Sequence, residues 1–280
     1  MTVTDGYYTA QEIAQDIWQI GEPGGVYSYL IEGKSRAALV DAGYGFADIR
    51  RICGFITDKP TDVLLTHGHT DHYGGAFYFP YVYMNTADFP VYRAYEDVQK
   101  QLIVSKFRRD RAQAGLPDVW PADFDERKYM AMHIGEFRLL QDKQIMDLGG
   151  RELEMIALPG HTRGSMVILD RKSGLAFSGD SVSCSYWGFF SFSRPLHEYA
   201  ENLERAAQIP VKGYYAAHYQ VMFPPQITED ILKAIGQADP ERDGHFRHPR
   251  TGQPARRHIG PCTCMDTVSR IYIVYDDAKM

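Results

Sequence analysis

The chain has 280 residues, 44% of them hydrophobic and 24% charged, which are ordinary values for a globular protein able to bury a large core. The net charge of -6 does not favour a nucleic-acid partner, and we expect neither a signal peptide nor a membrane helix, because no cationic apolar leader and no run of 18 apolar residues is present. The four cysteines are too few and too scattered for a disulfide framework, which predicts a reduced, cytoplasmic setting.

Strand and turn patterns alternate along the first quarter of the chain. Short alternating or apolar stretches predict strands at 16–20, 26–33 and 37–45, and helical spacing predicts a helix over 46–56. The apolar run DVLLT at 62–66 predicts a buried strand. The segment THGHTDHYGG follows it directly, on the loop at a strand's carboxyl end, where open α/β sheets commonly place their sites.

Residues 80–145 predict a helical insert. QKQLIVSKFRRDRAQAG, at 99–115, is a cationic amphipathic helix that ends at Gly115, and the proline-containing stretch at 116–129 predicts a loop. We interpret the segment as a solvated insert and keep a lid over the site as a hypothesis. The aromatic stretch at 79–95 would be either a dimer face or buried packing, so a homodimer stays open.

Strand patterns return in the second half, at 151–160, 165–170, 175–180 and 214–218. Helices are predicted at 197–209 and 228–238, a polar loop at 239–261 and a last strand at 270–277. We find no fixed repeat and no linker. The sequence therefore predicts an α/β protein that forms a single domain over 1–280.

The cluster after the buried strand contains three histidines and one aspartate within six positions: His67, His69, Asp71 and His72. Imidazole and carboxylate are usual ligands of Zn²⁺ and similar metals. Protonated together these side chains would repel one another, and buried unpaired they would be costly. The spacing predicts metal binding, with the first two side chains turned toward one ion and the last two toward an adjacent one.

Three further donors each follow a predicted strand. His161 lies in LPGHTRGS, Asp180 in LAFSGDS and His218 at the end of YYAAH. A lone histidine is often a core or surface residue, and a lone aspartate often caps a turn. For Asp180 and His218 the sequence leaves both interpretations open, whereas for His161 we favour the metal.

THGHTDH matches the HxHxDH motif of the metallo-β-lactamase superfamily, and the three downstream segments resemble its remaining metal-binding segments in the expected order. The resemblance spans about Trp18 to His218. It implies a four-layer αβ/βα sandwich with a two-metal site at the sheet edge. It implies that His67, His69 and His161 bind the first metal. It implies that Asp71, His72 and His218 bind the second metal, and that Asp180 bridges the two metals.

The resemblance also implies a mechanism. A hydroxide between two divalent ions would be the nucleophile, and Asp71 could orient it or carry a proton. Zn²⁺ is the default ion, although iron or manganese can occupy the same donors. Asp41, which ends a predicted strand near the site, would either support the ligands or simply form a turn.

Departures from the motif narrow the subfamily. Asp180 argues against β-lactam hydrolysis, because class B β-lactamases usually lack this bridging aspartate, and His69 argues against flavodiiron oxidoreductases. Glyoxalase II and N-acyl-homoserine lactonases share the ligand set. The basic glutathione-binding tail of the former has no match here, and Tyr186 lies six residues after Asp180, further than in the lactonase pattern.

The segment SVSCSYWGFFSFSR, at 181–194, predicts either a core strand or an aromatic wall beside the metals, with Tyr186 as a hydrogen-bond donor to a developing oxyanion. His245 and His248 are interpreted as non-ligands, although they could reach the site if the 239–261 loop folds over it. Cys262 and Cys264 carry a weak metal signal and are interpreted as ordinary thiols.

The sequence thus predicts a dinuclear metal-dependent hydrolase of a small ester, thioester or lactone. The alternatives are a metal-dependent phosphodiesterase or nuclease and, less favoured, a β-lactamase or a metal-binding protein without catalysis. The acidic net charge favours a small, uncharged or weakly charged substrate over a nucleic acid.

Overall fold

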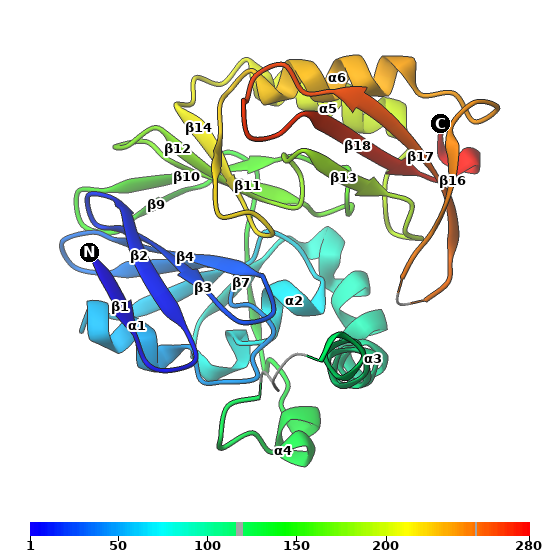
Figure 1. The fold of residues 1–280 in the computed structure, drawn as a ribbon. Helices are drawn as coiled ribbons and strands as arrows, with labels where there is room; N and C mark the ends of the chain where they lie inside the picture. The colour runs from blue at the N-terminus through cyan, green and yellow to red at the C-terminus, as the bar shows by residue number, and fades with distance from the viewer. Residues whose placement is uncertain (116–119, 250) are drawn as a thin grey trace. The chain divides into compact units, whose positions relative to one another are not determined.

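The structure is a computed structural model that describes residues 1–115, 120–249 and 251–280 (Figure 1). It divides into two compact units. Unit 1 contains Met1–Leu140 and Met146–Glu152, and unit 2 contains Gln141–Ile145 and Leu153–Met280. Each unit is described by itself, and the prediction of a single domain over 1–280 stays a prediction.

Unit 1 contains one eight-stranded sheet whose strands follow the order of the chain. The strands are β1 (Thr2–Thr4), β2 (Thr9–Ala14), β3 (Ile17–Gly21), β4 (Tyr27–Glu32), β5 (Ala37–Val40), β6 (Thr61–Leu64), β7 (Val82–Met84) and β8 (Phe137–Leu139). Neighbouring strands from β1 to β5 are antiparallel, and those from β5 to β8 are parallel. Val40 pairs with Leu64, so the loops that follow β5 and β6 leave the sheet at the same edge.

The helices of unit 1 occupy the crossovers between its parallel strands. They are α1 (Arg50–Ile56), α2 (Thr70–Tyr73), α3 (Phe89–Ala114) and α4 (Glu126–Ala131), with the short 3₁₀ turns η1 (Ala76–Tyr78) and η2 (Thr86–Asp88). Ile52 on α1 packs in one core with Leu39 of β5 and Val63 of β6. The strands predicted at 16–20, 26–33 and 62–66 are confirmed, the strand predicted at 37–45 ends earlier, at Val40, and the helix predicted at 46–56 begins later, at Arg50.

The predicted helical insert at 80–145 does contain α3 and α4, but its ends are the strands β7 and β8, which extend the sheet. Helix α3 begins at Phe89, ten residues before the predicted start, and ends as predicted at Gly115, whose φ of 63° is left-handed. The predicted loop at 116–129 is partly wrong, and residues 116–119 of it lie outside the described residues. Helix α4 begins inside this range because the Asp125 side chain accepts hydrogen bonds from its first backbone N–H groups.

Aromatic contacts anchor the insert within unit 1. The Phe107 ring of α3 packs edge-on against Tyr44 and Phe46, with centroid distances of 4.9 and 5.4 Å. The Tyr129 hydroxyl of α4 donates a hydrogen bond to the Tyr44 carbonyl oxygen at 3.0 Å. The insert therefore packs on the loop that follows β5, and the lid hypothesis stays a prediction.

Unit 2 is built on two sheets, one with the strands β15-β14-β12-β11-β10 in that order and one of order β13-β18-β17-β16. The strands are β10 (Glu152–Ala157), β11 (Met166–Asp170), β12 (Leu175–Gly179), β13 (Ser185–Gly188), β14 (Gly213–Ala216), β15 (Met222–Phe223), β16 (Gly244–Arg247), β17 (Pro254–Pro261) and β18 (Arg270–Tyr275). Of β9 (Ile145–Asp147), Ile145 belongs to unit 2 and the other two residues belong to unit 1. The helices are α5 (Leu196–Ala207) and α6 (Ile227–Gln237), with the 3₁₀ turn η3 (Asp277–Lys279) near the end. The predicted strands and helices of the second half are confirmed.

The predicted loop at 239–261 is wrong over 244–247 and 254–261, which form the strands β16 and β17. Along β17 the exposed residues Arg257 and Ile259 alternate with the partly buried His258 and the buried Gly260. Only one face of this strand is covered, so its composition is polar and imitates a loop. Glycine and proline at the strand ends strengthen that impression.

The core of unit 2 joins both sheets to both helices. Leu203 of α5 and Ile231 of α6 pack in one cluster with Val167 of β11 and Ile273 of β18. Sheets and helices together confirm the α/β class. In the part of the chain that the structure describes, every helix is too short or too polar to cross a membrane.

Candidate metal centre

The first donor set lies in unit 1, on the loop that leaves β6 and on α2. Gly68 separates His67 from His69, and its backbone N–H donates to the buried Asp88 carboxylate at 2.8 Å. A Cβ at this position would lie 2.9 Å from the Asp88 carbonyl oxygen and 3.1 Å from the Tyr92 nitrogen. The close approach requires glycine between the two histidines and fixes the path of the loop.

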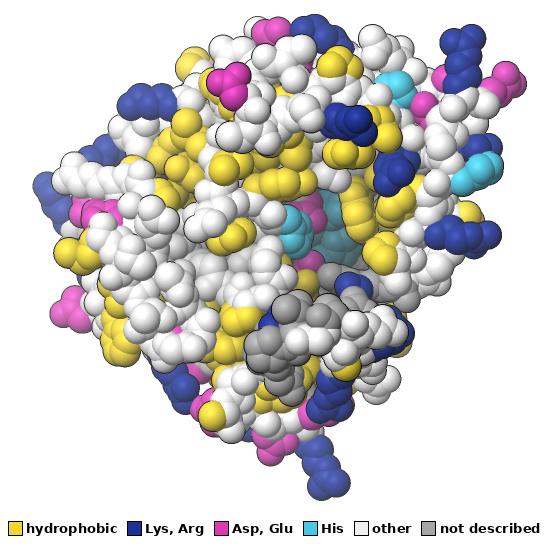
Figure 2. Space-filling view, viewed as in Figure 1, with side chains coloured by type: hydrophobic (Ala, Val, Ile, Leu, Met, Phe, Trp, Pro, Cys, Tyr) yellow, Lys and Arg dark blue, Asp and Glu magenta, His cyan; other side chains and the backbone are white. Residues whose placement is uncertain are grey.

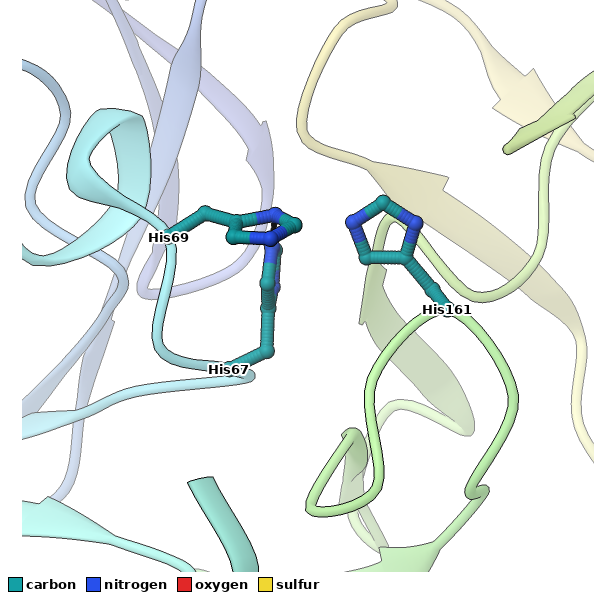
Figure 3. A group of neighbouring side chains, drawn as sticks. All are labelled: His67, His69 and His161. Carbon is teal, nitrogen blue, oxygen red and sulfur yellow. Dashed lines mark hydrogen bonds between the residues drawn. The ribbon is translucent and has the colours of Figure 1, made fainter. Parts of the chain in front are cut away.

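The three imidazole rings of this set crowd together. His67 Nε2 and His69 Nδ1 are 3.1 Å apart, and Figure 3 shows these two rings side by side. The ring centroids of His67 and His72 are 3.9 Å apart. Nitrogens at this spacing either share a proton or turn their lone pairs toward one cation.

Asp41 orients two histidines of this set through hydrogen bonds on the side of their Nδ1 atoms. Its Oδ2 lies 2.8 Å from His72 Nδ1 and accepts a hydrogen bond of 2.7 Å from the Thr66 hydroxyl. Because a carboxylate only accepts, His72 carries its proton on Nδ1 and directs its Nε2 lone pair away from Asp41. Thr66 Oγ1 lies 3.1 Å from His67 Nδ1. Because this hydroxyl already donates its hydrogen bond to Asp41, it accepts one from His67 Nδ1–H, so His67 also presents the lone pair of Nε2.

Asp71 lies in the first turn of α2, next to His72, and is half-buried. The structure thus brings the four clustered residues predicted from the sequence into unit 1 on one loop and one short helix. A carboxylate on the same turn as the imidazoles can bind a cation or accept a proton from one.

His161 opens the second donor set, in unit 2, on the loop that follows β10 (Figure 3). Its Nδ1 lies 2.7 Å from the Trp187 carbonyl oxygen, which only accepts, so its Nε2 carries the lone pair. A Cβ on the preceding Gly160 would lie 2.3 Å from the Tyr199 ring. Glycine is therefore required where this loop crosses α5.

Asp180 and His218 follow the neighbouring parallel strands β12 and β14, in which Gly179 pairs with Ala216. The register brings both residues to one edge of the sheet. Asp180 Oδ2 lies 3.5 Å from His161 Nε2, and its Oδ1 lies 3.4 Å from His218 Nε2. The carboxylate thus offers one oxygen toward each histidine, which is the arrangement that a bridging ligand needs.

A group of aromatic side chains lies beside His161. The Phe190 ring is 5.5 Å from the His161 ring, and Phe189, Phe190 and Trp187 pack with two residues of the β16 region. We call the following five residues the aromatic cluster: Trp187, Phe189, Phe190, Phe246 and His248. Three of its rings, those of Trp187, Phe190 and Phe246, are only half-buried. The cluster therefore offers an apolar surface beside a predicted metal ligand.

Tyr186 lies in the core of unit 2 and is only 1% exposed. Its ring stacks on Tyr199 at 3.8 Å, and its hydroxyl has no hydrogen-bond partner among the described residues. Burial, and then the neighbouring Tyr199, raise the pKa of Tyr186 well above its usual value, so the phenol keeps its proton. Its predicted role as an oxyanion donor stays a prediction.

The donor chemistry of both sets fits divalent metal ions. His67, His72 and His161 each use Nδ1 on a protein acceptor, which leaves Nε2 as the ligand atom. The other donors are imidazoles and carboxylates, which suit Zn²⁺, iron or manganese. Each set alone offers fewer donors than two ions require.

A family model described as the metallo-beta-lactamase superfamily matches residues 21–218, which is more than two thirds of the chain. The chain belongs to this superfamily. Its resemblance to the HxHxDH proteins, predicted from four short segments, is confirmed.

Named relatives of this superfamily member include hydrolases. The chain is 29% identical to the acyl-coenzyme A thioesterase MBLAC2 of Gallus gallus over 55% of this chain, a match that spans 56% of that protein. It is 25% identical to the hydroxyacylglutathione hydrolase GloC of Haemophilus influenzae, over 66% of this chain and 79% of the relative. A metallo-beta-lactamase family protein of Thermus thermophilus matches with a TM-score of 0.58 and 20% identity, over 79% of this chain and 80% of that one. The last match confirms the predicted fold.

Two features of the site escaped sequence reasoning or stayed open there. The sequence left Asp41 as either a supporting residue or a turn residue, and its contacts with His72 and Thr66 show the supporting arrangement. Phe246 was not foreseen, because the strand that carries it was predicted as loop. The alternation of apolar and polar residues from 244 to 247 was the available signal.

We predict that Asp41→Asn weakens metal binding by about 10- to 100-fold, because the amide cannot hold the protonated Nδ1 of His72 and the Thr66 hydroxyl as a carboxylate does. Metal retained after dialysis against a graded chelator measures the change. Asp48→Asn, which removes a carboxylate paired with Arg50, is the matched control and should bind as the unchanged protein does. Equal affinity in all three proteins would contradict the orienting role of Asp41.

Proposed function

We propose that this chain is a metal-dependent hydrolase of acyl thioesters, in which the seven predicted ligands bind two divalent metal ions. Superfamily membership supports metal-dependent hydrolysis. The names of two relatives support the substrate class, one an acyl-coenzyme A thioesterase and the other a hydrolase of an acyl derivative of glutathione. Zn²⁺ is the default ion, and the predicted cytoplasmic setting stays a prediction.

The hydrogen bonds around the ligands support this ligand set. A histidine whose Nδ1–H donates a hydrogen bond is fixed in one tautomer, with its Nε2 lone pair in one direction. Little reorganisation of these histidines is therefore needed when an ion binds. Asp180, with one oxygen toward His161 and one toward His218, supports the bridging role. Bound divalent ions would supply Lewis acidity at the acyl oxygen and lower the pKa of bound water toward about 7.

This chain's own side chains would perform the remaining tasks. Hydrolysis adds water to the acyl carbon and breaks the C–S bond, giving a carboxylic acid and a thiol. Asp71 would accept the proton of the attacking water and pass it to the leaving sulfur. Tyr186, kept protonated by burial, would donate a hydrogen bond to the oxyanion that forms at the acyl carbon.

The observation that carries the substrate class is the aromatic cluster beside His161. Half-buried rings next to a metal ligand favour an apolar acyl group over a sugar or a phosphate. Simple esters and lactones stay alternatives, since they present the same acyl carbon. Figure 2 shows basic and acidic side chains interspersed on one face, which supports a small-molecule substrate over a nucleic acid.

We predict that metal-replete protein hydrolyses acyl thioesters and that Asp180→Asn lowers kcat by at least about 100-fold, because the bridging carboxylate loses one anionic oxygen. A panel of thioesters, esters, lactones and phosphodiesters measures the preference, and metal analysis measures the ions retained per chain. Asp266→Asn, at an exposed position, is the control for a lost aspartate charge. A panel that turns over phosphodiesters alone, with an affinity that falls steeply with salt, would replace this proposal with the phosphodiesterase alternative.

Tyr186→Phe separates a catalytic hydroxyl from a structural one. We predict a loss of about 100-fold in kcat if the phenol serves the oxyanion. The free energy of unfolding should stay within about 1 kcal/mol, because the hydroxyl has no protein partner to lose. Tyr199→Phe is the matched control, since its hydroxyl donates to the Ser181 carbonyl at 2.6 Å and its loss should cost stability instead. An unchanged kcat in Tyr186→Phe would remove this residue from the mechanism.

Phe190→Ala tests the acyl-binding surface. We predict that kcat/KM falls about tenfold or more for a long-chain acyl thioester and much less for an acetyl thioester, because a ring that buries apolar chain contributes about 1.5–3 kcal/mol. The exposed neighbour Ser191→Ala should leave both values unchanged. An equal loss for both chain lengths would mean that Phe190 only supports His161.

A further inference from the structure

A second group of metal-binding atoms lies within unit 2 and has no part in the proposed hydrolysis. It contains the Sγ atoms of Cys262 and Cys264 and a carboxylate oxygen of Asp230, and these three ligand atoms all lie within 4.8 Å of one another. Both cysteines occupy the turn between β17 and β18, and Asp230 lies in the first half of α6, which packs on that hairpin (Figure 1).

The separation of the two sulfur atoms excludes a disulfide and is compatible with binding to a shared ion. The Sγ atoms are 3.7 Å apart. In a disulfide the distance would be about 2.05 Å. Two thiolates bound to one tetrahedral ion at about 2.3 Å are separated by the edge of the tetrahedron, which is about 3.8 Å. The spacing found here matches that edge.

Asp230 holds the turn in this geometry. Its Oδ2 accepts hydrogen bonds from the backbone N–H groups of Thr263, at 2.6 Å, and Cys264, at 3.1 Å. Its Oδ1 accepts one from the Thr263 hydroxyl at 2.7 Å. Each carboxylate oxygen has two lone pairs, so Oδ1 retains one for an ion. Asp230 is 2% exposed, so its side chain is already held in place and loses little conformational freedom when an ion binds.

We propose that Cys262, Cys264 and Asp230 form a binding site for one thiophilic divalent ion such as Zn²⁺, with a fourth position open to water or an external ligand. Two thiolates and a carboxylate are soft and hard anionic donors that together suit Zn²⁺ or Cd²⁺. The site uses none of the seven predicted ligands of the hydrolytic centre, so it would be occupied independently of them.

The charges around the site are compatible with a cation. Burial, and then the hydrogen bond with Cys262, raise the pKa of Cys264 to about 12, so without an ion its thiol keeps its proton. The ion would exchange for thiol protons on binding. Lys233 Nζ lies 3.9 Å from Asp230 Oδ1, but its side chain is 64% exposed and can turn into solvent when an ion arrives.

Titration of the reduced full-length protein with Cd²⁺ tests the proposal, because thiolate-to-metal charge transfer absorbs in the near ultraviolet whereas histidine and carboxylate ligands do not. We expect this absorbance to saturate at one Cd²⁺ per chain and to disappear in Cys262→Ser and in Cys264→Ser. Zn²⁺ added afterwards should displace the signal. Cys53→Ala, which removes a buried thiol of unit 1, should leave the titration unchanged.

Folding and the hydrolytic centre are monitored separately. Circular dichroism and thioester turnover of both serine variants should equal those of the unchanged protein, which shows that the lost signal is not lost structure. A titration of the folded, reduced protein without charge-transfer absorbance would overturn the proposal. So would a signal that survives in both serine variants. Neither result depends on whether the chain hydrolyses thioesters.

Discussion

The donor arrangement in this chain depends on one physical constraint: several imidazoles can be crowded together only if each carries its proton on the side away from the others. In unit 1 His72 donates the hydrogen bond of its Nδ1–H to Asp41, and in unit 2 His161 donates that of its Nδ1–H to the Trp187 carbonyl oxygen. His67 donates its Nδ1–H to the Thr66 hydroxyl, and that hydroxyl in turn donates a hydrogen bond to Asp41. Without these acceptors the tautomers would be free, and rings 3.9 Å apart would present a mixture of protons and lone pairs to any ion.

The acceptors are in place because of the sheets. In unit 1 the parallel pairing of β5 with β6 brings Asp41 and Thr66 to the same edge of the sheet. Asp41 follows the last paired residue of β5 by one position, and Thr66 follows the last paired residue of β6 by two. In unit 2 the pairing of β12 with β14 does the same for Asp180 and His218. Residues that follow parallel strands share an edge whatever their separation in the chain. Strand register therefore sets the donor geometry, and the glycines at 68 and 160 let the loops follow it.

Most of the strands, the helices and the residues of the candidate metal centre could be predicted from the sequence, because the signals for them are local in the chain. Three histidines within six residues, apolar runs that end in Asp or His, and helical spacing at 197–209 each depend on neighbours in the chain. Prediction failed where a strand has one solvated face, as in β17, since a half-covered strand of mostly polar residues with Arg257 outward resembles a loop in composition. It also could not decide the role of Asp41, because that role depends on a contact with His72, 31 residues away.

The two kinds of donor in this protein differ in their selectivity for metal ions. Imidazoles and carboxylates held by fixed hydrogen bonds accept several divalent metals with similar geometry, so the identity of the ion there follows availability as much as chemistry. A pair of sulfur atoms 3.7 Å apart is more selective, because it favours soft, tetrahedral ions and must release thiol protons to bind them. The thiol pair belongs to the hairpin of β17 and β18, and Phe246 of the aromatic cluster lies on the neighbouring strand β16 of the same sheet. Because thioester turnover is expected to stay unchanged when either cysteine is replaced, this shared sheet is not expected to couple the thiol pair to the proposed acyl-binding surface.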